Sequence, residues 1–368
     1  PYSTFPKIAV MKKLFIVIFV SLFIVNHAQS QGCVAVRSTG AFCTKQDAMT
    51  ATAQGWQLNL GYRYFRSFRH YRGDEEQKER LEHHTEVINW SNNLDVTLVR
   101  NFNSRWSMAL NVPVISNVRS SLYEHGGNAA GQEGRHKTRS FGIGDVRVSG
   151  YYWLMEAAKS MKFNVQLGLG LKLATGDYKY QDYFVKADGS KLLGPVDQSI
   201  QLGDGGTGFT TELNAFYNFT HNIGVYGNVY YLFNPREQNG VSTARGGTPS
   251  AANIANGSDV MSVPDQYMVR GGVNFTTAQR FSISAGLRYE CVPSEDAIGG
   301  SNGFRRPGYI LSFEPAVTYQ LKRTTLFASV PVAPERNRIQ SVPDKIRTDL
   351  TGTYTKGDAA FADYLINF

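Results

Sequence analysis

Cysteine, charge and long apolar runs are all scarce in this 368-residue sequence. Its 3 Cys residues show no Cys-x-x-Cys spacing, so a zinc or redox motif is unsupported. Charged residues make up only 18% of the chain, and the formal charge of +8 includes no Lys/Arg block, so we do not predict nucleic-acid binding. A single apolar run approaches the roughly 20 residues of a transmembrane helix, which excludes a polytopic helical membrane protein.

Glycine and aromatic residues are abundant instead, with 36 Gly, 22 Phe and 20 Tyr, although the mean hydropathy is below zero. Aromatic and β-branched residues occur along the whole chain, which argues against intrinsic disorder. The folded protein must therefore bury or shield a large aromatic surface.

The N-terminal residues predict an export signal. Two Lys residues precede the apolar run 14–25, and small residues follow as far as Ser30. This order indicates a signal peptide over residues 11–30 that is cleaved after Ser30, with Met11 as the natural start and residues 1–10 as upstream sequence. The alternative is an uncleaved anchor.

The segment 31–53 precedes the first predicted strand and has two interpretations. It folds into the lumen as a plug, or it is a periplasmic tail. Export into an oxidising compartment allows a disulfide between Cys33 and Cys43, and two free thiols are the alternative.

Strict alternation of apolar and polar residues dominates the chain after residue 54. It is clearest over 164–173, 281–290 and 309–320. Each run is longer than the five or six residues that are usual in soluble strands. A strand that crosses a membrane at a tilt needs about 9–11 residues.

The predicted strands are separated by alternating long and short gaps, which is the pattern of an up-and-down barrel with long extracellular loops and short periplasmic turns. We predict an all-β fold, a transmembrane antiparallel barrel of about 12 strands over residues 54–368. A soluble β-sandwich or β-helix is the alternative, but neither sorts its loops by length. The predicted strands are 54–67, 84–101, 104–115, 140–153, 161–175, 207–219, 222–234, 264–277, 280–292, 308–320, 323–332 and 360–368.

Aromatic residues flank the apolar stretches, as in the interfacial girdles of membrane barrels. Examples are Trp106, Tyr217, Tyr231, Tyr309 and Tyr319. The chain ends in a short alternating segment with a terminal Phe, which looks like the C-terminal strand that the barrel-assembly machinery of Gram-negative bacteria reads.

Three Gly-Asp segments carry a family resemblance. Residues 141–148, 167–178 and 202–209 contain Gly144-Asp145, Thr175-Gly176-Asp177 and Gly203-Asp204-Gly205. They resemble the outer-membrane transporter family named after the phenol meta-cleavage pathway, which is more distantly similar to long-chain fatty-acid transporters. The resemblance spans roughly residues 55–368 and implies an outer-membrane barrel and uptake of a small, hydrophobic solute. Ala174 stands where the family has Pro.

The alternation also assigns side chains to two faces. Leu94, Leu98, Leu167, Leu169 and Leu287 are predicted to face lipid. Six bases and five acids fall on the opposite face, where a lumen avoids the cost of charge in hydrocarbon. They form either a polar translocation path or an ion-pair network that fills the barrel. The predicted lumen-lining residues are Arg63, Asp95, Arg105, Asp145, Arg147, Lys172, Glu212, Arg270, Arg288, Glu290 and Glu314.

Other candidate motifs are weak. His70, His83 and His84 lie in an acidic loop, but neighbouring strand residues point to opposite faces, so we predict no metal site and no cofactor. Residues 299–303 match Gly-x-Ser-x-Gly in a Gly-rich loop without the strand-elbow-helix context of hydrolases, so we predict no catalytic residue.

We therefore predict a passive outer-membrane channel or transporter and not an enzyme. Its partners are outer-membrane lipid, a small-molecule solute and the barrel-assembly machinery. The second hypothesis is an accessory barrel with a filled lumen that belongs to a larger outer-membrane complex, and the third is an outer-membrane hydrolase.

Overall fold

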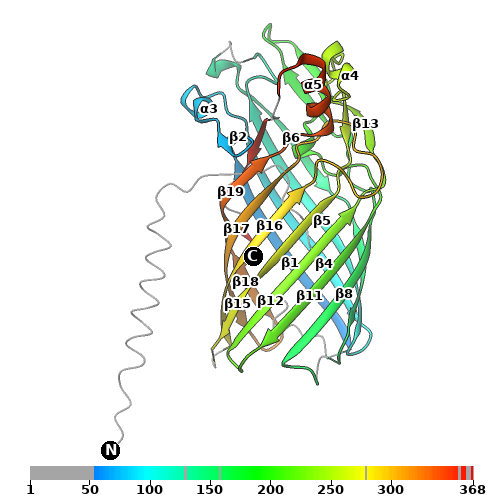
Figure 1. The fold of residues 1–368 in the computed structure, drawn as a ribbon, viewed down its shortest axis with the longest axis vertical. Coiled ribbons are helices and arrows are strands. Elements are labelled where there is room, and N and C mark those ends of the chain that lie inside the picture. Colours follow the sequence, from blue (N-terminus) through cyan, green and yellow to red (C-terminus); the bar gives the residue numbers. More distant parts are fainter. Residues whose placement is uncertain are drawn as a thin grey trace, which may run out of the picture.

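The computed structural model describes residues 54–127, 131–156, 159–277, 280–354, 358–361 and 366–367. In Figure 1 tilted strands form a barrel, with long loops at one end and short turns at the other. The signal peptide, the segment 31–53 and the pair Cys33 and Cys43 lie outside the described residues.

The barrel wall consists of antiparallel strands, each hydrogen-bonded to its neighbours. These are β1 (Gly55–Ser67), β4 (Ile88–Asn101), β5 (Trp106–Ser121), β6 (His136–Ile143), β7 (Arg147–Trp153), β8 (Phe163–Lys172), β11 (Gly208–Asn218), β12 (Ile223–Phe233), β15 (Gln266–Thr276), β16 (Phe281–Val292), β17 (Gly308–Gln320), β18 (Thr325–Ser329), β19 (Val332–Arg338) and β21 (Ile366–Asn367).

Two strands of the wall are interrupted. β6 and β7 both pair with β5, and β18 and β19 both pair with β17, so each couple occupies one position in the wall. β21 pairs with β1 and β18 and closes the ring. The 14 strands of this sheet therefore occupy twelve positions around the barrel, which is the number of strands that the alternation predicts.

Shorter elements occupy the loops at one end of the barrel, where Figure 1 places α3, α4 and α5. The strands are β2 (Arg69–Arg72), β3 (Glu75–Glu76), β9 (Gln181–Val185), β10 (Lys191–Pro195), β13 (Gln238–Ser242), β14 (Val260–Ser262) and β20 (Asp358–Phe361). The helices are α3 (Lys78–Glu82), η2 (Gln132–Gly134), η3 (Gln198–Ile200), α4 (Ala251–Ala255) and α5 (Val342–Thr351). In the described residues, no helix is both long and apolar enough to span a membrane.

α5 shows why a sequence predicted as plain loop contains a helix. The Ser341 side chain accepts a hydrogen bond from the Asp344 backbone N–H, and the Asp344 side chain accepts one from the Ser341 backbone N–H. Pro343 lies in the first turn, and Gly352 ends the helix with a φ of 68°. These helix signals lie between the predicted strands 323–332 and 360–368, in residues 333–359. The search for alternating residues detects strands only, so it did not predict this helix.

The outer face is apolar, as the alternation predicts. In β8, Leu167, Leu169 and Leu171 are exposed, with Leu169 at 68%, whereas the alternate residue Lys172 is 2% exposed. Trp106, Tyr217 and Tyr319 are exposed near the short turns. Toward the loop end, the rings of Tyr231, Tyr267, Tyr289 and Tyr309 stack across four strands at centroid distances of 5.7, 6.1 and 5.3 Å. Such aromatic rows are typical of the two interfaces of a membrane barrel.

Candidate functional site: the barrel interior and its loop-end cavity

Most of the predicted lumen residues lie on the inner face. Glu212, Arg270, Arg288 and Glu314 are buried on four different strands, and Arg63 forms an ion pair with Asp95 at 3.0 Å. Because side chains alternate along a strand, each apolar residue facing outward directs its polar neighbours into the barrel.

Arg105 is the exception, and its assignment to the lumen is wrong. β5 begins at Trp106, so Arg105 lies in the turn after β4, where it is exposed. The Asn103 side chain accepts hydrogen bonds from the backbone N–H groups of Arg105 and Trp106 and so holds this turn. The Arg105 guanidinium donates to the Tyr152 hydroxyl at 3.1 Å.

Elsewhere the inner face is packed with paired polar groups. Arg288 lies 2.9 Å from Glu290 and 3.5 Å from Glu314, and all three residues are less than 7% exposed. Glu212 accepts hydrogen bonds from the Tyr151 hydroxyl and the Asn228 amide. Burial of these charges is tolerated because opposite charges and hydrogen bonds compensate them. Paired charges of this kind are what the ion-pair interpretation of the lumen residues predicts.

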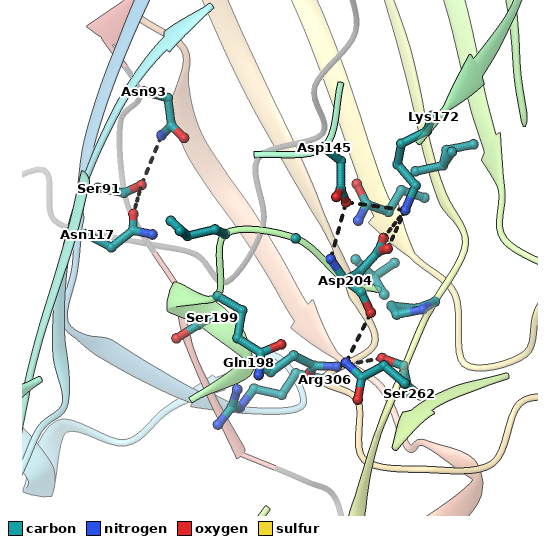
Figure 2. Close-up of a pocket in the computed structure, with 18 of the residues that line it drawn as sticks. Ser91, Asn93, Asn117, Asp145, Lys172, Gln198, Ser199, Asp204, Ser262 and Arg306 are labelled. Atoms are coloured by element: carbon teal, nitrogen blue, oxygen red, sulfur yellow. Dashed lines mark hydrogen bonds and ion pairs between the residues drawn. The ribbon is translucent and has the colours of Figure 1, made fainter. Parts of the chain in front are cut away.

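The three Gly-Asp segments converge on Asp145, in the interruption between β6 and β7. One Asp145 oxygen accepts from the Gly176 backbone N–H at 3.0 Å, and the other accepts from the Asp204 backbone N–H at 3.2 Å. The Lys172 ammonium forms ion pairs with Asp204 and, at 3.7 Å, with Asp145 (Figure 2). A Cβ on Gly203 would lie 2.5 Å from Asp145, so glycine is needed for this approach.

Residues 196–206, which we name the constriction segment, follow the β9–β10 hairpin and fold against the inner wall. The Ile200 carbonyl accepts hydrogen bonds from Asn117 of β5 and Ser140 of β6. A Cβ on Gly142 would lie 2.8 Å from the Leu202 side chain, so the segment touches the wall there as well.

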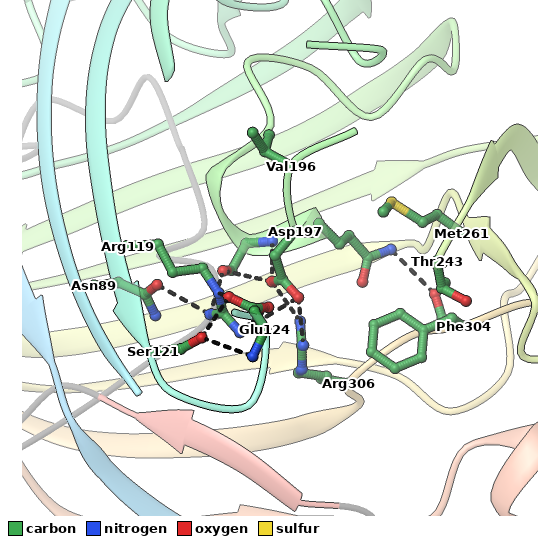
Figure 3. Close-up of polar contacts among 12 residues, drawn as sticks. Asn89, Arg119, Ser121, Glu124, Val196, Asp197, Thr243, Met261, Phe304 and Arg306 are labelled. Carbon is green, nitrogen blue, oxygen red and sulfur yellow. Dashed lines mark hydrogen bonds and ion pairs between the residues drawn. The ribbon is translucent and has the colours of Figure 1, made fainter. Parts of the chain in front are cut away.

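Asp197 anchors the constriction segment (Figure 3). Arg306 donates to its two oxygens at 3.0 and 2.8 Å, and Arg119 of β5 lies 3.4 Å away. Although burial alone raises the pKa of this carboxyl, the two guanidinium groups hold its pKa well below the usual range. The Asp197 side chain also accepts from the Ser199 backbone N–H and caps η3.

Glu124 extends the same network to two further loops. Arg119 donates to it at 2.9 and 3.1 Å, and Arg245 lies 3.2 Å away. Burial raises the pKa of Glu124, but the adjacent guanidinium groups outweigh burial and lower it. Next in the chain, burial lowers the pKa of His125 to about 4, and its Nδ1 accepts from the Val185 backbone N–H of β9. The loop end is thus a connected polar structure.

A cavity of about 150 Å³ lies between the constriction segment and the barrel wall. The wall contributes Arg63, Asn93 and Asn117, while the constriction segment contributes Gln198 and Gln201. Figure 2 shows Asn93 and Asn117 on one side and Gln198 on the other. Asp145, Arg147 and Lys172 of the predicted lumen set also line it, whereas Glu212, Arg270 and Arg288 do not.

The alternation predicts residues 176–206 to be an extracellular loop between two strands, and the candidate plug was predicted at residues 31–53. The Asp197-Gln198-Ser199 sequence resembles ordinary turn chemistry, and only its burial between two arginines distinguishes it from the exposed Asp188-Gly189-Ser190. In the described residues, no three His, Cys, Asp or Glu side chains are grouped so as to hold a metal ion.

The fold is that of an outer-membrane β-barrel. The crystal structure of the COG4313 outer membrane channel from Pseudomonas putida F1 matches with a TM-score of 0.50 at 12% sequence identity, over 86% of this chain and 97% of that chain. The resemblance in the Gly-Asp segments is therefore confirmed at the level of the fold.

Two other channel structures are similar at lower scores. The CymD monoaromatic hydrocarbon channel has a TM-score of 0.41 at 9% identity, over 90% of this chain and 94% of that chain. A Pseudomonas aeruginosa FadL homologue has a TM-score of 0.40 at 8% identity, over 87% of this chain and 90% of that chain. No protein-family model matches the sequence, and no curated protein is similar to it in sequence.

Proposed function

We propose that the protein is a passive outer-membrane channel that admits a small solute through the loop-end cavity. The main support is the cavity itself, which lies inside a barrel wall and beneath a segment that folds inward. Twelve strands are intermediate between small barrels that side chains fill and large barrels with an open channel. An inward segment therefore has a large effect on the width of the path.

Export by a cleaved signal peptide and insertion by the barrel-assembly machinery belong to this proposal, as does the role of the inner charges in the path. The exposed apolar outer face supports the lipid environment.

Reconstitution into planar lipid bilayers tests the proposal. We expect stepwise ion currents from the purified, heat-modifiable barrel, because the lumen residues are polar. A folded barrel that gives no current in a planar bilayer and no solute entry in liposomes would exclude the channel function.

The second candidate is an accessory barrel with a filled lumen. The buried group of Arg288, Glu290 and Glu314 supports it, because packed ion pairs stiffen a wall and obstruct a path. Extraction in mild detergent distinguishes the two. An accessory barrel should co-purify with other outer-membrane proteins, whereas a channel of the kind proposed should purify alone and still conduct.

A further inference from the structure

We propose that the loop-end cavity binds a small neutral polyhydroxyl compound, of the polyol or small-sugar class, as the solute of this channel. The inference rests on the proposed function and names its solute class. It differs from the hydrophobic solute that the family resemblance implies, and the chemistry of the cavity lining is the reason.

The size of the cavity limits the solute. An engineered protein cavity of about 150 Å³ with an apolar lining holds a benzene molecule. The cavity described here has a similar volume of about 150 Å³, so it suits a short chain or single ring with its substituents. Most of the residues that line it are polar or charged, so a solute binds best there if it replaces the hydrogen bonds of the water it displaces.

Side-chain amides make up a large part of the polar lining. They belong to Asn93 and Asn117 of the wall and to Gln198 and Gln201 of the constriction segment. Gln201 is only 9% exposed, and its Nε2 lies 3.1 Å from the Met261 sulfur, which fixes the amide. A hydroxyl group both donates and accepts, as an amide does through its two ends, so the hydroxyls of one small molecule can pair with such amides. An apolar solute would displace water from these amides without replacing its hydrogen bonds, at a cost in affinity.

The charges around the cavity are balanced, which favours a neutral solute. Arg63 pairs with Asp95 and Arg306 pairs with Asp197, while Lys172 forms ion pairs with both Asp204 and Asp145. Arg147 is the fourth cation of the lining, so four cations stand against four carboxylates. A carboxylate solute would meet basic groups that are already paired with acids, and a cationic solute would meet acidic groups that are already paired with bases. Neither sign of charge meets an excess of the opposite sign in these pairs.

The amides beside these pairs are held in place. The Asn93 amide donates to Ser91 Oγ at 2.9 Å, and Ser91 Oγ donates to Asn117 Oδ1 at 2.7 Å (Figure 2). Because this chain of hydrogen bonds orients the polar wall before a solute arrives, little ordering is required on binding.

The experiment measures block of the single-channel current by added solutes. The probes are xylitol, its carboxylate counterpart xylonate, and toluene. We expect xylitol to reduce the current reversibly at concentrations about tenfold lower than xylonate, with no block by toluene. A stronger block by xylonate or toluene than by xylitol would overturn the inference and leave the channel function standing.

Variants connect the block to the cavity. Gln201→Leu and Asn93→Leu should each weaken the xylitol block about tenfold, because each removes hydrogen-bonding capacity from the lining. Gln181→Leu is the matched control, since Gln181 is exposed on β9 and does not line the cavity. Ion current through each variant shows that it is folded. An unchanged block in both cavity variants would refute the assignment.

Titration calorimetry in detergent keeps the inference testable if no current flows. Xylitol binding to the wild-type barrel that is lost in Gln201→Leu would then support the site while the channel function fails. Absence of both current and xylitol binding would refute both.

Discussion

Replacing Asp197 with Asn tests how the constriction segment is held. The substitution removes one negative charge and keeps the size of the side chain. Asn is as good an N-cap as Asp, so the hydrogen bond to the Ser199 backbone N–H is retained. The change therefore isolates the electrostatic attachment of the segment to Arg119 and Arg306.

The magnitude follows from the burial of the two arginines. Their side chains are 3% and 11% exposed, and that of Asp197 is 5% exposed. Removing one partner of such a buried pair costs about 3–5 kcal/mol. Arg119 keeps its two hydrogen bonds to Glu124, so most of the cost falls on Arg306. Even about 3 kcal/mol changes the ratio of seated to displaced segment by roughly two orders of magnitude.

Single-channel recording and limited proteolysis measure the displacement. We expect Asp197→Asn to raise the mean conductance and to speed cleavage within residues 196–206. Asp188→Asn is the matched control, because Asp188 makes the same contacts to Ser190 but is exposed. If Asp197→Asn and Asp188→Asn both match the wild type in conductance and cleavage, the proposed role of the Asp197 ion pairs is refuted.

Three further outcomes are expected. Lys172→Met should lower the free energy of unfolding in detergent by about 3–5 kcal/mol, because it removes the buried cation that pairs with Asp145 and Asp204. A second change, Asp204→Asn, should restore part of this free energy, and no recovery would contradict the reasoning. Gly203→Ala should shift heat-modifiable migration to lower temperature, whereas Gly150→Ala, whose Cβ has no neighbour closer than 4.0 Å, should not. Burial lowers the pKa of His125 to about 4 in the folded loop, whereas an unfolded histidine has a pKa near 6.5. The unfolded loop therefore binds more protons below about pH 6.5, and the stability of the loop should fall as the pH drops from about 6.5 to 4. Hydrogen exchange of the loop amides measures this fall, and a pH-independent rate of opening would contradict it.

The barrel wall could be predicted well because its signal is local. The strand predicted over 308–320 has these bounds in the structure, and those over 207–219 and 222–234 differ by one residue at each end. The predicted bounds were wrong where pairing with a neighbouring strand decides where a strand begins or ends. β5 continues to Ser121 because β6 pairs with it above the interruption, whereas the strand predicted to start at residue 84 begins at Ile88.

The site was predicted less completely. Asp145, Arg147 and Lys172 were placed in the lumen by alternation, and they line the cavity. The prediction could not show that Asp145 receives backbone hydrogen bonds from both Gly176 and Asp204, because these contacts join residues 31 and 59 positions apart. Residues 176–206 likewise contain only the turn-forming sequences of an ordinary polar loop, so their sequence does not predict that part of them folds inward.

By itself, the sequence determined the two faces of the wall and the number of strands, because alternate residues of a strand point to opposite sides whatever the strand pairs with. Only the tertiary structure decided that residues 196–206 fold inward. That placement depends on Arg119 and Arg306 meeting at one carboxylate, although they are 187 positions apart along the chain. Closure of the barrel brings these two arginines together. The buried Asp197 carboxylate is stable there because opposite charges reach it.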